Sequence, residues 1–491
     1  GGPFLPQGEI DALVLASLGQ HGIQPANLCT GSVFLRRVYL DVIGTLPEPA
    51  EVRAFLRDTR PDKRAQVIES LLLREEFADY WSLKWCDVLR VKSEYPINLW
   101  PNAVQAYHRW VHDAIRGNMA YDQFARELLT ANGSNFRVPQ VNFYRAVQAR
   151  DPGSLAVAAG LTFMGVRLET WPVKKRSDMA VFFSRVAYKS TDEWKEEIVF
   201  PDPVQTGPLH VVFPDGTEVT LPERHDPRDA FAGWLTAPDN PWFARNAVNR
   251  VWAWLFGHGI VDPPDDVRPD NPAVNPALLD YLEKELVRAQ FDLRHIYRLI
   301  LNSSTYQQSS IPRGDTAAAE TYFACYPVRR LDAEVLVDAV SWLTTSPVEY
   351  SSAIPEPFTY IPASERSIDL ADGSISSPAL EMFGRPARDT GLFFERNNDP
   401  TDEQRRFLLN SSAIQRGIER GQRLRQMIAA SKGNPSNAIQ VVYVAVLSRP
   451  PTPEEIATVE RYAQTGGITL KQAADDVIWA LVNTKEFLYR H

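Results

Sequence analysis

Apolar residues recur at the spacing of an α-helix through most of this chain, and prolines interrupt the pattern at short intervals. The 37 prolines lie mainly between the periodic segments, where they end helices and fix turns. Thr401 is followed three residues later by Gln404, which is the pattern of a capping box. The pattern predicts a mainly α fold with helices over 10–18, 52–58, 63–73, 104–115, 121–129, 244–255, 277–289, 331–343, 401–418 and 470–481.

Two stretches depart from the helical period. Residues 197–200 and 210–221 are rich in β-branched and aromatic residues, and Asp215-Gly216 separates two such runs as a hairpin turn does. We expect a small β insert over 196–223. Residues 350–390 are rich in Pro, Ser and Gly and have no period, so this segment is either a functional loop or an arm that wraps the fold.

The two ends of the chain contain the same pattern. Residues 38–49 align without gaps with residues 442–453, and acidic helix starts and a further helix follow both. We expect one small helical unit at each end, with the two units packed together. The copies differ where chemistry could reside: Arg36, Arg37 and Asp41 of the first correspond to Gln440, Val441 and Ala445 of the second.

Charge and cysteine content exclude several classes of protein. The formal net charge is -9, whereas nucleic-acid-binding proteins usually carry massed Lys and Arg, so we expect no nucleic-acid partner. No apolar run approaches the roughly 20 residues of a membrane span. The first residues lack the basic and apolar regions of a signal peptide, so any such peptide has been removed.

The three cysteines are Cys29, Cys86 and Cys325. They form neither a Cys-x-x-Cys pair nor a Cys-x-x-Cys-His motif, so the chain cannot hold a covalently attached haem. Cys86 lies in an aromatic helix and is expected in the core. A single disulfide among the three remains open, because the spacing does not identify a pair.

Long motifs in both halves resemble a known family. They are 34–41 (FLRRVYLD), 239–252 (DNPWFARNAVNRVW), 256–262 (FGHGIVD), 329–334 (RRLDAE) and 383–389 (FGRPARD). The chain resembles a paired domain-of-unknown-function family that is abundant in planctomycetes and verrucomicrobia. The resemblance implies a first helical domain over 8–195 and a second over 224–490. It also implies a location outside the cytoplasm, in proteins that often carry cytochrome c modules, but no established activity.

The chain departs from this family at two places. Many members have a Cys-x-x-Cys-His motif where this chain has residues 167–175, which contain neither Cys nor His. Many also have Cys-Glu-Cys-Glu-Arg where this chain has Leu392-Phe393-Phe394-Glu395-Arg396. The resemblance therefore implies a branch without the haem or metal site, and we expect no cofactor.

A glycine-flanked histidine is the first candidate for a catalytic residue. His258 lies between Gly257 and Gly259, where an accessible imidazole could act as a general base. Asp265 and Asp266 follow, with Arg268, and carboxylate oxygens are ligands for hard cations. The alternative is a proline-rich loop with solvated acids.

His108 and His112 are the candidates for metal ligands. They are four residues apart on a predicted helix, so both side chains lie on one face. A zinc protease helix would have Glu directly after the first His, whereas this chain has Arg109. We predict no metal site, and the alternative is a partly exposed helix face.

Arginine-rich groups are the candidates for ligand binding. They could form buried ion-pair networks, or a basic pocket for a carboxylate or a sulfated sugar. Most lie in the motifs that carry the resemblance. The candidates are Arg36, Arg37, Asp41, Asn249, Arg250, Arg329, Arg330, Arg385, Arg388, Asp389, Glu395 and Arg396.

These observations favour a periplasmic or secreted, haem-free scaffold or binding protein of a polysaccharide- or envelope-associated system. Its expected partner is a protein or a polysaccharide. The alternative is an enzyme, a metal-assisted hydrolase or an oxidoreductase that uses His258, Asp265 and Asp266.

Overall fold

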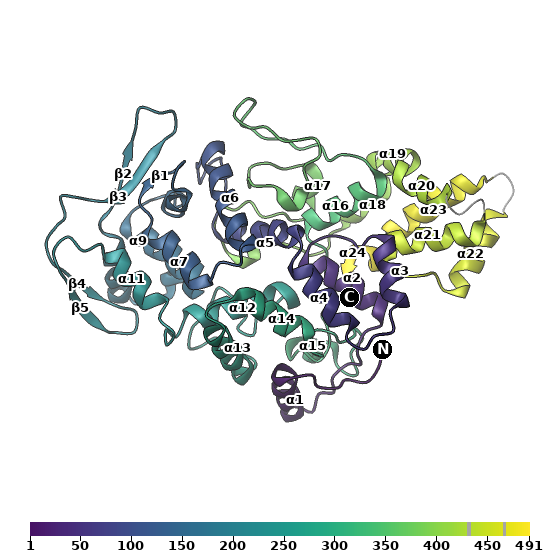
Figure 1. The fold of residues 1–491 in the computed structure, drawn as a ribbon, viewed down its shortest axis with the longest axis horizontal. Coiled ribbons are helices and arrows are strands. Elements are labelled where there is room, and N and C mark those ends of the chain that lie inside the picture. Colours follow the sequence, from purple (N-terminus) through teal and green to yellow (C-terminus); the bar gives the residue numbers. More distant parts are fainter. Residues whose placement is uncertain (430–433, 465–467) are drawn as a thin grey trace.

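The computed structural model describes residues 1–429, 434–464 and 468–491 and confirms a mainly α fold (Figure 1). The first half contains α1 (Glu9–His21), α2 (Gly31–Val42), α3 (Pro49–Arg57), α4 (Lys63–Leu72), α5 (Glu75–Val88), α6 (Pro101–Arg116), α7 (Tyr121–Thr130), α8 (Asn142–Arg145), α9 (Pro152–Ala159) and α10 (Val173–Ala180). The second half contains α11 (Pro227–Leu235), α12 (Phe243–Phe256), α13 (Pro276–Arg288), α14 (Leu293–Asn302), α15 (Thr316–Thr321), α16 (Ala333–Thr344) and α17 (Pro378–Met382). The last helices are α18 (Asp402–Asn410), α19 (Ser412–Arg420), α20 (Gln422–Ala429), α21 (Pro435–Leu447), α22 (Pro453–Ala463), α23 (Leu470–Val482) and α24 (Lys485–Leu488).

One predicted helix is divided in two. The expected helix over 401–418 ends at Asn410, and α19 begins one residue after Ser411. The Ser411 hydroxyl accepts a bond from the backbone N–H of Ile414 at 3.3 Å, so this serine caps a new helix. The capping box of Thr401 and Gln404 at the start of α18 is confirmed.

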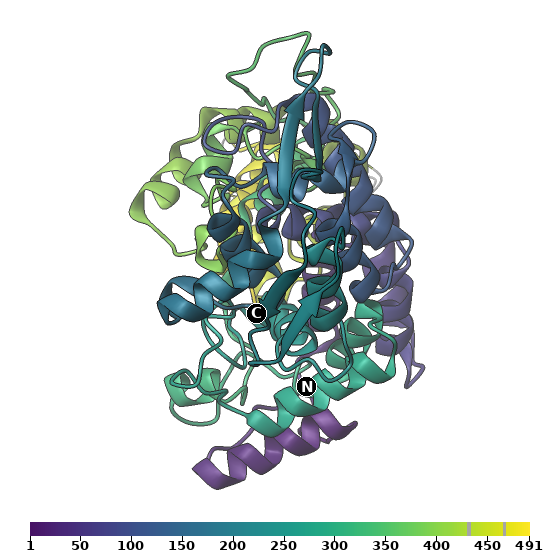
Figure 2. The same ribbon diagram turned by 90° about the vertical axis from the view of Figure 1, so that its left-hand side faces the viewer.

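The predicted hairpin is present, but the β region begins earlier than expected. Strands β4 (Leu209–Val212) and β5 (Glu218–Leu221) pair antiparallel around Gly216, which has φ of 91°. Strand β3 (Glu197–Pro201) pairs with β2 (Val186–Ser190) on one side and with β1 (Gly133–Ser134) on the other. Figure 2 shows both sheets at the same end of the molecule. Because β1 and β2 precede residue 196, the insert shares its sheet with the preceding domain.

The two ends of the chain pack together, as the internal repeat predicted. Helix α21 packs against α3, and α24 lies beside α2 (Figure 1). Arg36 on α2 donates to the carbonyl oxygens of Val446 at 2.8 Å and Phe487 at 3.1 Å, and to the Ser448 hydroxyl at 3.3 Å. The final strand β7 (Tyr489–Arg490) pairs with β6 (Arg329–Arg330). The C-terminus is therefore anchored both to the first helices and to the centre of the chain.

The two sequence domains share one hydrophobic core. A single cluster of buried apolar side chains contains residues from both halves. Helix α1 packs against α13, α4 packs against α14, and α12 packs against the π-helical turn η2 (Gly160–Met164). Cys29, Cys86 and Cys325 are buried and unpaired, so the open disulfide is not formed. Within the described ranges, no helix has the length and apolarity of a membrane span.

The irregular segment 350–390 is an arm that lies against the first domain. Its regular elements are the single turn η5 (Ser367–Asp369) and α17. Asp372 accepts a bond from the backbone N–H of Ser93 at 2.9 Å, and Gly373 donates its backbone N–H to Val91 at 3.0 Å. The chain that follows the arm forms one wall of the main pocket.

Candidate functional site

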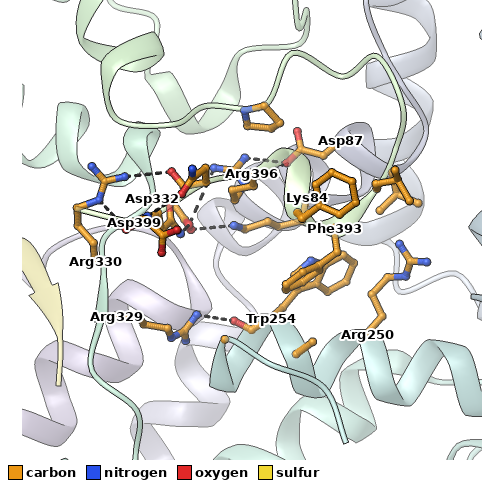
Figure 3. Close-up of a pocket in the computed structure, with 18 of the residues that line it drawn as sticks. Lys84, Asp87, Arg250, Trp254, Arg329, Arg330, Asp332, Phe393, Arg396 and Asp399 are labelled. Carbon is orange, nitrogen blue, oxygen red and sulfur yellow. Dashed lines mark hydrogen bonds and ion pairs between the residues drawn. The ribbon is translucent and has the colours of Figure 1, made fainter. Parts of the chain in front are cut away.

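A pocket of about 580 Å³ lies where the two sequence domains meet (Figure 3). Helix α5 contributes one side, α12 contributes a second, and β6 lies between the last strand and the segment 386–400. The ionisable side chains that line it are Lys84, Asp87, Arg250, Arg329, Arg330, Asp332, Arg396 and Asp399. The aromatic side chains that line it are Trp254, Phe393, Phe394 and Tyr489.

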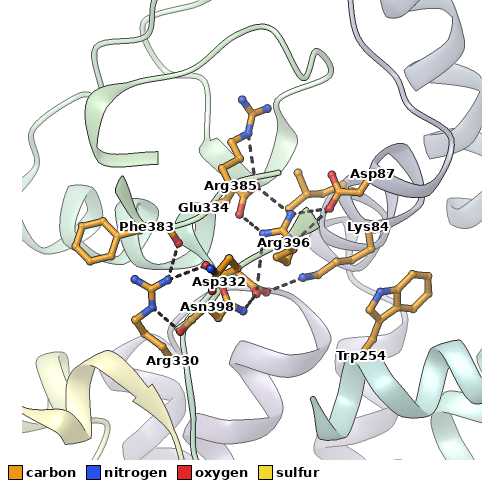
Figure 4. A network of polar contacts seen from close by, with 12 residues as sticks. Lys84, Asp87, Trp254, Arg330, Asp332, Glu334, Phe383, Arg385, Arg396 and Asn398 are labelled. Atoms are coloured by element: carbon orange, nitrogen blue, oxygen red, sulfur yellow. Dashed lines mark hydrogen bonds and ion pairs between the residues drawn. The ribbon is translucent and has the colours of Figure 1, made fainter. Parts of the chain in front are cut away.

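Asp332 is a central acceptor in the wall of this pocket (Figure 4). One of its oxygens, Oδ2, accepts bonds from Lys84 Nζ at 2.8 Å, from the Tyr80 hydroxyl at 2.8 Å and from Arg490 at 3.1 Å. The other oxygen accepts a bond from the Asn398 amide at 2.7 Å. This carboxylate therefore accepts bonds from four donors in three separate parts of the chain, which are α5, the segment after the arm and the last strand.

Arg396 connects two further carboxylates (Figure 4). Its guanidinium lies 2.7 Å from Asp87 and 2.6 Å from Glu334. Arg388 also pairs with Asp87 at 2.9 Å, and Arg385 pairs with Glu334 at 3.5 Å. Of the two alternatives for the 385–396 region, the buried ion-pair network is present, and it joins α5, α16 and the end of the arm.

Asp41 extends the network toward the N-terminal unit. It pairs with Arg490 at 2.9 Å and Arg329 at 3.0 Å, and it accepts bonds from the hydroxyls of Tyr306 and Tyr326 at 2.8 Å each. Since Arg490 also pairs with Asp332, a continuous set of ion pairs runs from α2 to the pocket wall.

The network contains more cations than carboxylates. Ion pairs of 4.0 Å or less connect six cations with four carboxylates, a formal excess of two positive charges. Its members are Lys84, Arg329, Arg385, Arg388, Arg396 and Arg490 with Asp41, Asp87, Asp332 and Glu334. Buried charge that lacks a counter-charge is costly, so this excess favours the entry of an anion.

Two other buried arginines add to the positive charge. Among the described residues, neither Arg250 nor Arg330 forms an ion pair with a carboxylate, and they are 2% and 4% exposed. Arg250 donates to the carbonyl of Leu161 at 3.1 Å, in the π-helical turn η2. Arg330 donates to the carbonyls of Phe383 at 2.7 Å and Asn398 at 3.1 Å.

The surrounding charges change the acidity of Lys84 and Asp332. Burial and the nearby Arg396 lower the pKa of Lys84 from 10.5 to about 8. Burial alone would raise the pKa of Asp332, but Lys84, Arg490 and Arg396 together hold it well below its usual value. Asp332 is thus ionised, and Lys84 is the cation of the pocket that gives up its proton most readily.

The predicted ligand-binding residues divide into three groups. Arg250, Arg329, Arg330 and Arg396 line the pocket. Asp41, Arg385 and Arg388 lie behind it in the ion network. The others have local structural contacts: Arg36 and Arg37 hold the C-terminal unit, Asn249 bonds Val261, Asp389 pairs with Lys92, and Glu395 accepts backbone bonds from Asp389 and Gly391.

The His258 loop does not gather its candidate residues at one point. The His258 ring stacks on Phe323 with centroids 4.8 Å apart, and burial lowers its pKa. Asp265 pairs with Arg167 at 2.9 Å and accepts the backbone N–H of Phe393 at 2.9 Å, whereas Asp266 pairs with Arg268 at 3.2 Å. Asp265 therefore positions the segment that carries Phe393 in the pocket.

The two candidate metal ligands, His108 and His112, lie outside the pocket. His112 pairs with Asp79 at 3.0 Å, and His108 lies 4.0 Å from Asp369. Burial lowers the pKa of His108 to about 3, which keeps its ring neutral. In the part of the chain that the structure describes, no group of three or more His, Cys, Asp or Glu side chains is arranged to hold a metal ion.

Sequence reasoning missed Lys84 and Trp254. The aromatic run of α5 indicated a core helix, and both Trp81 and Trp85 are indeed buried. Lys84 is 6% exposed at its side chain and lies between them in the sequence. A lysine inside an otherwise apolar helix face was the available signal, because such residues are almost never buried without a partner.

The two segments that depart from the family pattern meet in space. Arg167 lies over the ring of Phe394 at 5.7 Å, and it pairs with the same Asp265 that holds the backbone of Phe393. Residues 167 and 392–396 are therefore neighbours beside the pocket, although Arg167 and Leu392 are 225 residues apart in the sequence.

Comparisons with known proteins agree with the resemblance. Residues 9–165 match the family model PSCyt2, described as a protein of unknown function (DUF1549), and residues 227–463 match PSD1, described as a protein of unknown function (DUF1553). No curated protein and no solved structure matches the chain. The chain therefore belongs to the family in which these two domains of unknown function are paired.

Proposed function

We propose that this protein binds an acidic sugar, one that carries a carboxylate or a sulfate group, in the pocket between α5, α12 and β6. The proposed role is that of a binding protein in a polysaccharide- or envelope-associated system, in the periplasm or outside the cell. The observation that carries the proposal is the excess of buried cations over carboxylates in and behind the pocket wall.

The chemistry of the lining supports this class of ligand. Guanidinium groups bind carboxylate and sulfate through paired hydrogen bonds, and these hydrogen bonds are stronger where water is excluded. Trp254 and the exposed Phe394 line the pocket beside these cations, and sugar rings stack on aromatic side chains. The volume of about 580 Å³ lies within the range of small-molecule sites.

A calorimetric titration tests the proposal. Galacturonate and glucuronate oligosaccharides and sulfated galactose fragments are compared with neutral oligosaccharides of the same length, at one ionic strength. We expect binding of at least one acidic series and none of the neutral series. Arg250→Gln and Arg330→Gln should each weaken binding about tenfold to a hundredfold, because each removes one charged donor.

The exposed Arg126 on α7 provides the matched control, since Arg126→Gln removes the same charge far from the pocket. If either pocket variant fails to fold, the comparison of acidic with neutral sugars in the native chain still tests the proposal. Equal binding of both sugar series, or no binding of either, would overturn the proposal.

Nothing in the arrangement of His258, Asp265 and Asp266 favours a second function. The three side chains face Phe323, Arg167 and Arg268 respectively. A shared site would need them to converge on one reacting atom.

A further inference from the structure

Lys84 is the lysine in the wall of the pocket, and its surroundings differ from those of a purely structural ion pair. Its ammonium group lies 2.8 Å from Asp332, beside Trp254 (Figure 3). Arg396 and Arg490 pair with carboxylates of the same network. Cationic neighbours and burial both favour loss of a proton from an amine.

Asp332 does not depend on Lys84 for its neutralisation. Arg490 pairs with the same oxygen of Asp332 at 3.1 Å, and the Tyr80 hydroxyl donates to it at 2.8 Å. Asn398 occupies the second oxygen. When Lys84 becomes neutral, Asp332 keeps a cation and two neutral donors, and the positive excess of the network falls from two charges to one.

We infer that Lys84 is a nucleophilic amine that forms an imine with the carbonyl group of an acidic sugar or a related oxo acid. The inference rests on the proposed function, because the arginines of the pocket would hold the acidic group. It goes beyond that function by assigning a covalent step to the bound ligand.

The step balances without an oxidant or a second substrate. Nζ of neutral Lys84 adds to the carbonyl carbon, and the C–O π bond breaks. One proton moves from the nitrogen to the oxygen, and the oxygen then leaves with the second amine hydrogen as water, which gives a neutral imine. The imine nitrogen takes up from solvent the proton that Lys84 released when it became neutral, so it regains the positive charge that pairs with Asp332.

Reductive trapping tests the inference. The native protein is incubated with glyoxylate or with D-glucuronate, whose open-chain form is an aldehyde, in the presence of cyanoborohydride at pH 8. Peptide mass spectrometry then locates the modified lysines. We expect Lys84 to be labelled on the order of tenfold or more above exposed lysines, since the pKa of about 8 leaves far more of its amine neutral.

Three controls distinguish specific trapping at Lys84 from general labelling of lysines. Lys84→Arg keeps a cation opposite Asp332 but has no primary amine at this position, so trapping there should be lost. Lys92→Arg removes a lysine that pairs with Asp389 outside the pocket lining, and the labelling of Lys84 should be unchanged. Methyl glucuronide has no free carbonyl, and an excess of it should protect Lys84.

Binding of glucuronate is measured separately, without the reductant. If glucuronate binds but the label is absent from Lys84, or is spread evenly over the exposed lysines, the inference is overturned and the proposed function stands. Absence of both binding and labelling overturns both. If Lys84→Arg fails to fold, protection by methyl glucuronide in the native chain decides the outcome.

Discussion

At the scale of single residues, buried charge governs the chemistry of this protein. Outside the pocket, Glu365 and Asp369 lie close to Asp79 and Asp338, and His112 faces the same group from α6. Burial and these neighbouring carboxylates raise the pKa of Glu365 from 4.5 to about 7. Burial and Asp79 raise the pKa of Asp369 from 3.8 to about 6.

Glu365→Gln should therefore change how stability depends on pH. The pKa of Glu365 is raised in the folded protein. Its contribution to the stability of the fold is therefore present below about pH 4.5 and is lost as the pH rises toward 7. Because Glu365 is only half-buried, we expect the variant to be about 1 kcal/mol more stable than the native chain at pH 8 and equal to it near pH 4.5. Urea unfolding at both pH values measures this.

The exposed Glu349 supplies the control, and Glu349→Gln should change neither value beyond about 0.5 kcal/mol. A Glu365→Gln variant whose gain is the same at both pH values would contradict the explanation.

Residue identity alone indicated part of the site. The arginines of 329–334 and 385–396 were candidates because guanidinium groups concentrate there, and four of the predicted residues do line the pocket. Lys84 and Trp254 were not predicted, because their roles arise from contacts with residues far away in the sequence. Asp332 lies 248 residues from Lys84, and no local pattern carries that pairing.

At the scale of helices and strands, caps and repeats decide the arrangement. The periodicity predicted most helices, but it continued through Ser411, where side-chain capping starts a new helix. Strand β2 lies outside the expected insert, because its pairing with β3 depends on tertiary contact more than on its own composition. The repeated unit at the chain ends was predicted correctly, since its proline-rich turn is itself a local signal.

Arg36→Ala should release the C-terminal unit from α2. Arg36 is 2% exposed and donates to two carbonyls and one hydroxyl of that unit, so its loss leaves buried acceptors unpaired. We expect the free energy of unfolding in urea to fall by about 3 kcal/mol. Arg53 is exposed on the neighbouring α3, and Arg53→Ala should cost less than about 0.5 kcal/mol. Equal losses in the two variants would show that the contacts of Arg36 contribute little.

At the scale of the whole molecule, two sequence domains form one folded body. Packing of α1 on α13, of α4 on α14 and of α12 on η2 places apolar surface of each half against the other. The boundaries at 195 and 224 follow from the resemblance, and the family models match residues 9–165 and 227–463. Sequence patterns separate the two halves, whereas the core joins them.

Fragments 1–195 and 224–491 should therefore not fold alone. Each would expose the apolar surface that the other covers, and a domain without its core packing loses cooperative unfolding. We expect each fragment to show a near-ultraviolet circular dichroism spectrum without sharp bands and no sharp thermal transition. The intact chain should show a single thermal transition. A cooperative transition in either isolated fragment would contradict a shared core.

The pocket is also a property of the whole molecule, because its cations come from α5, α12, β6 and the segment after the arm. A crystal structure of the protein with a digalacturonate tests its role most directly. The account predicts a carboxylate of the sugar within hydrogen-bond distance of at least two of Lys84, Arg250, Arg329, Arg330 and Arg396. A sugar bound elsewhere, or a pocket that holds only water at saturating ligand, would contradict it.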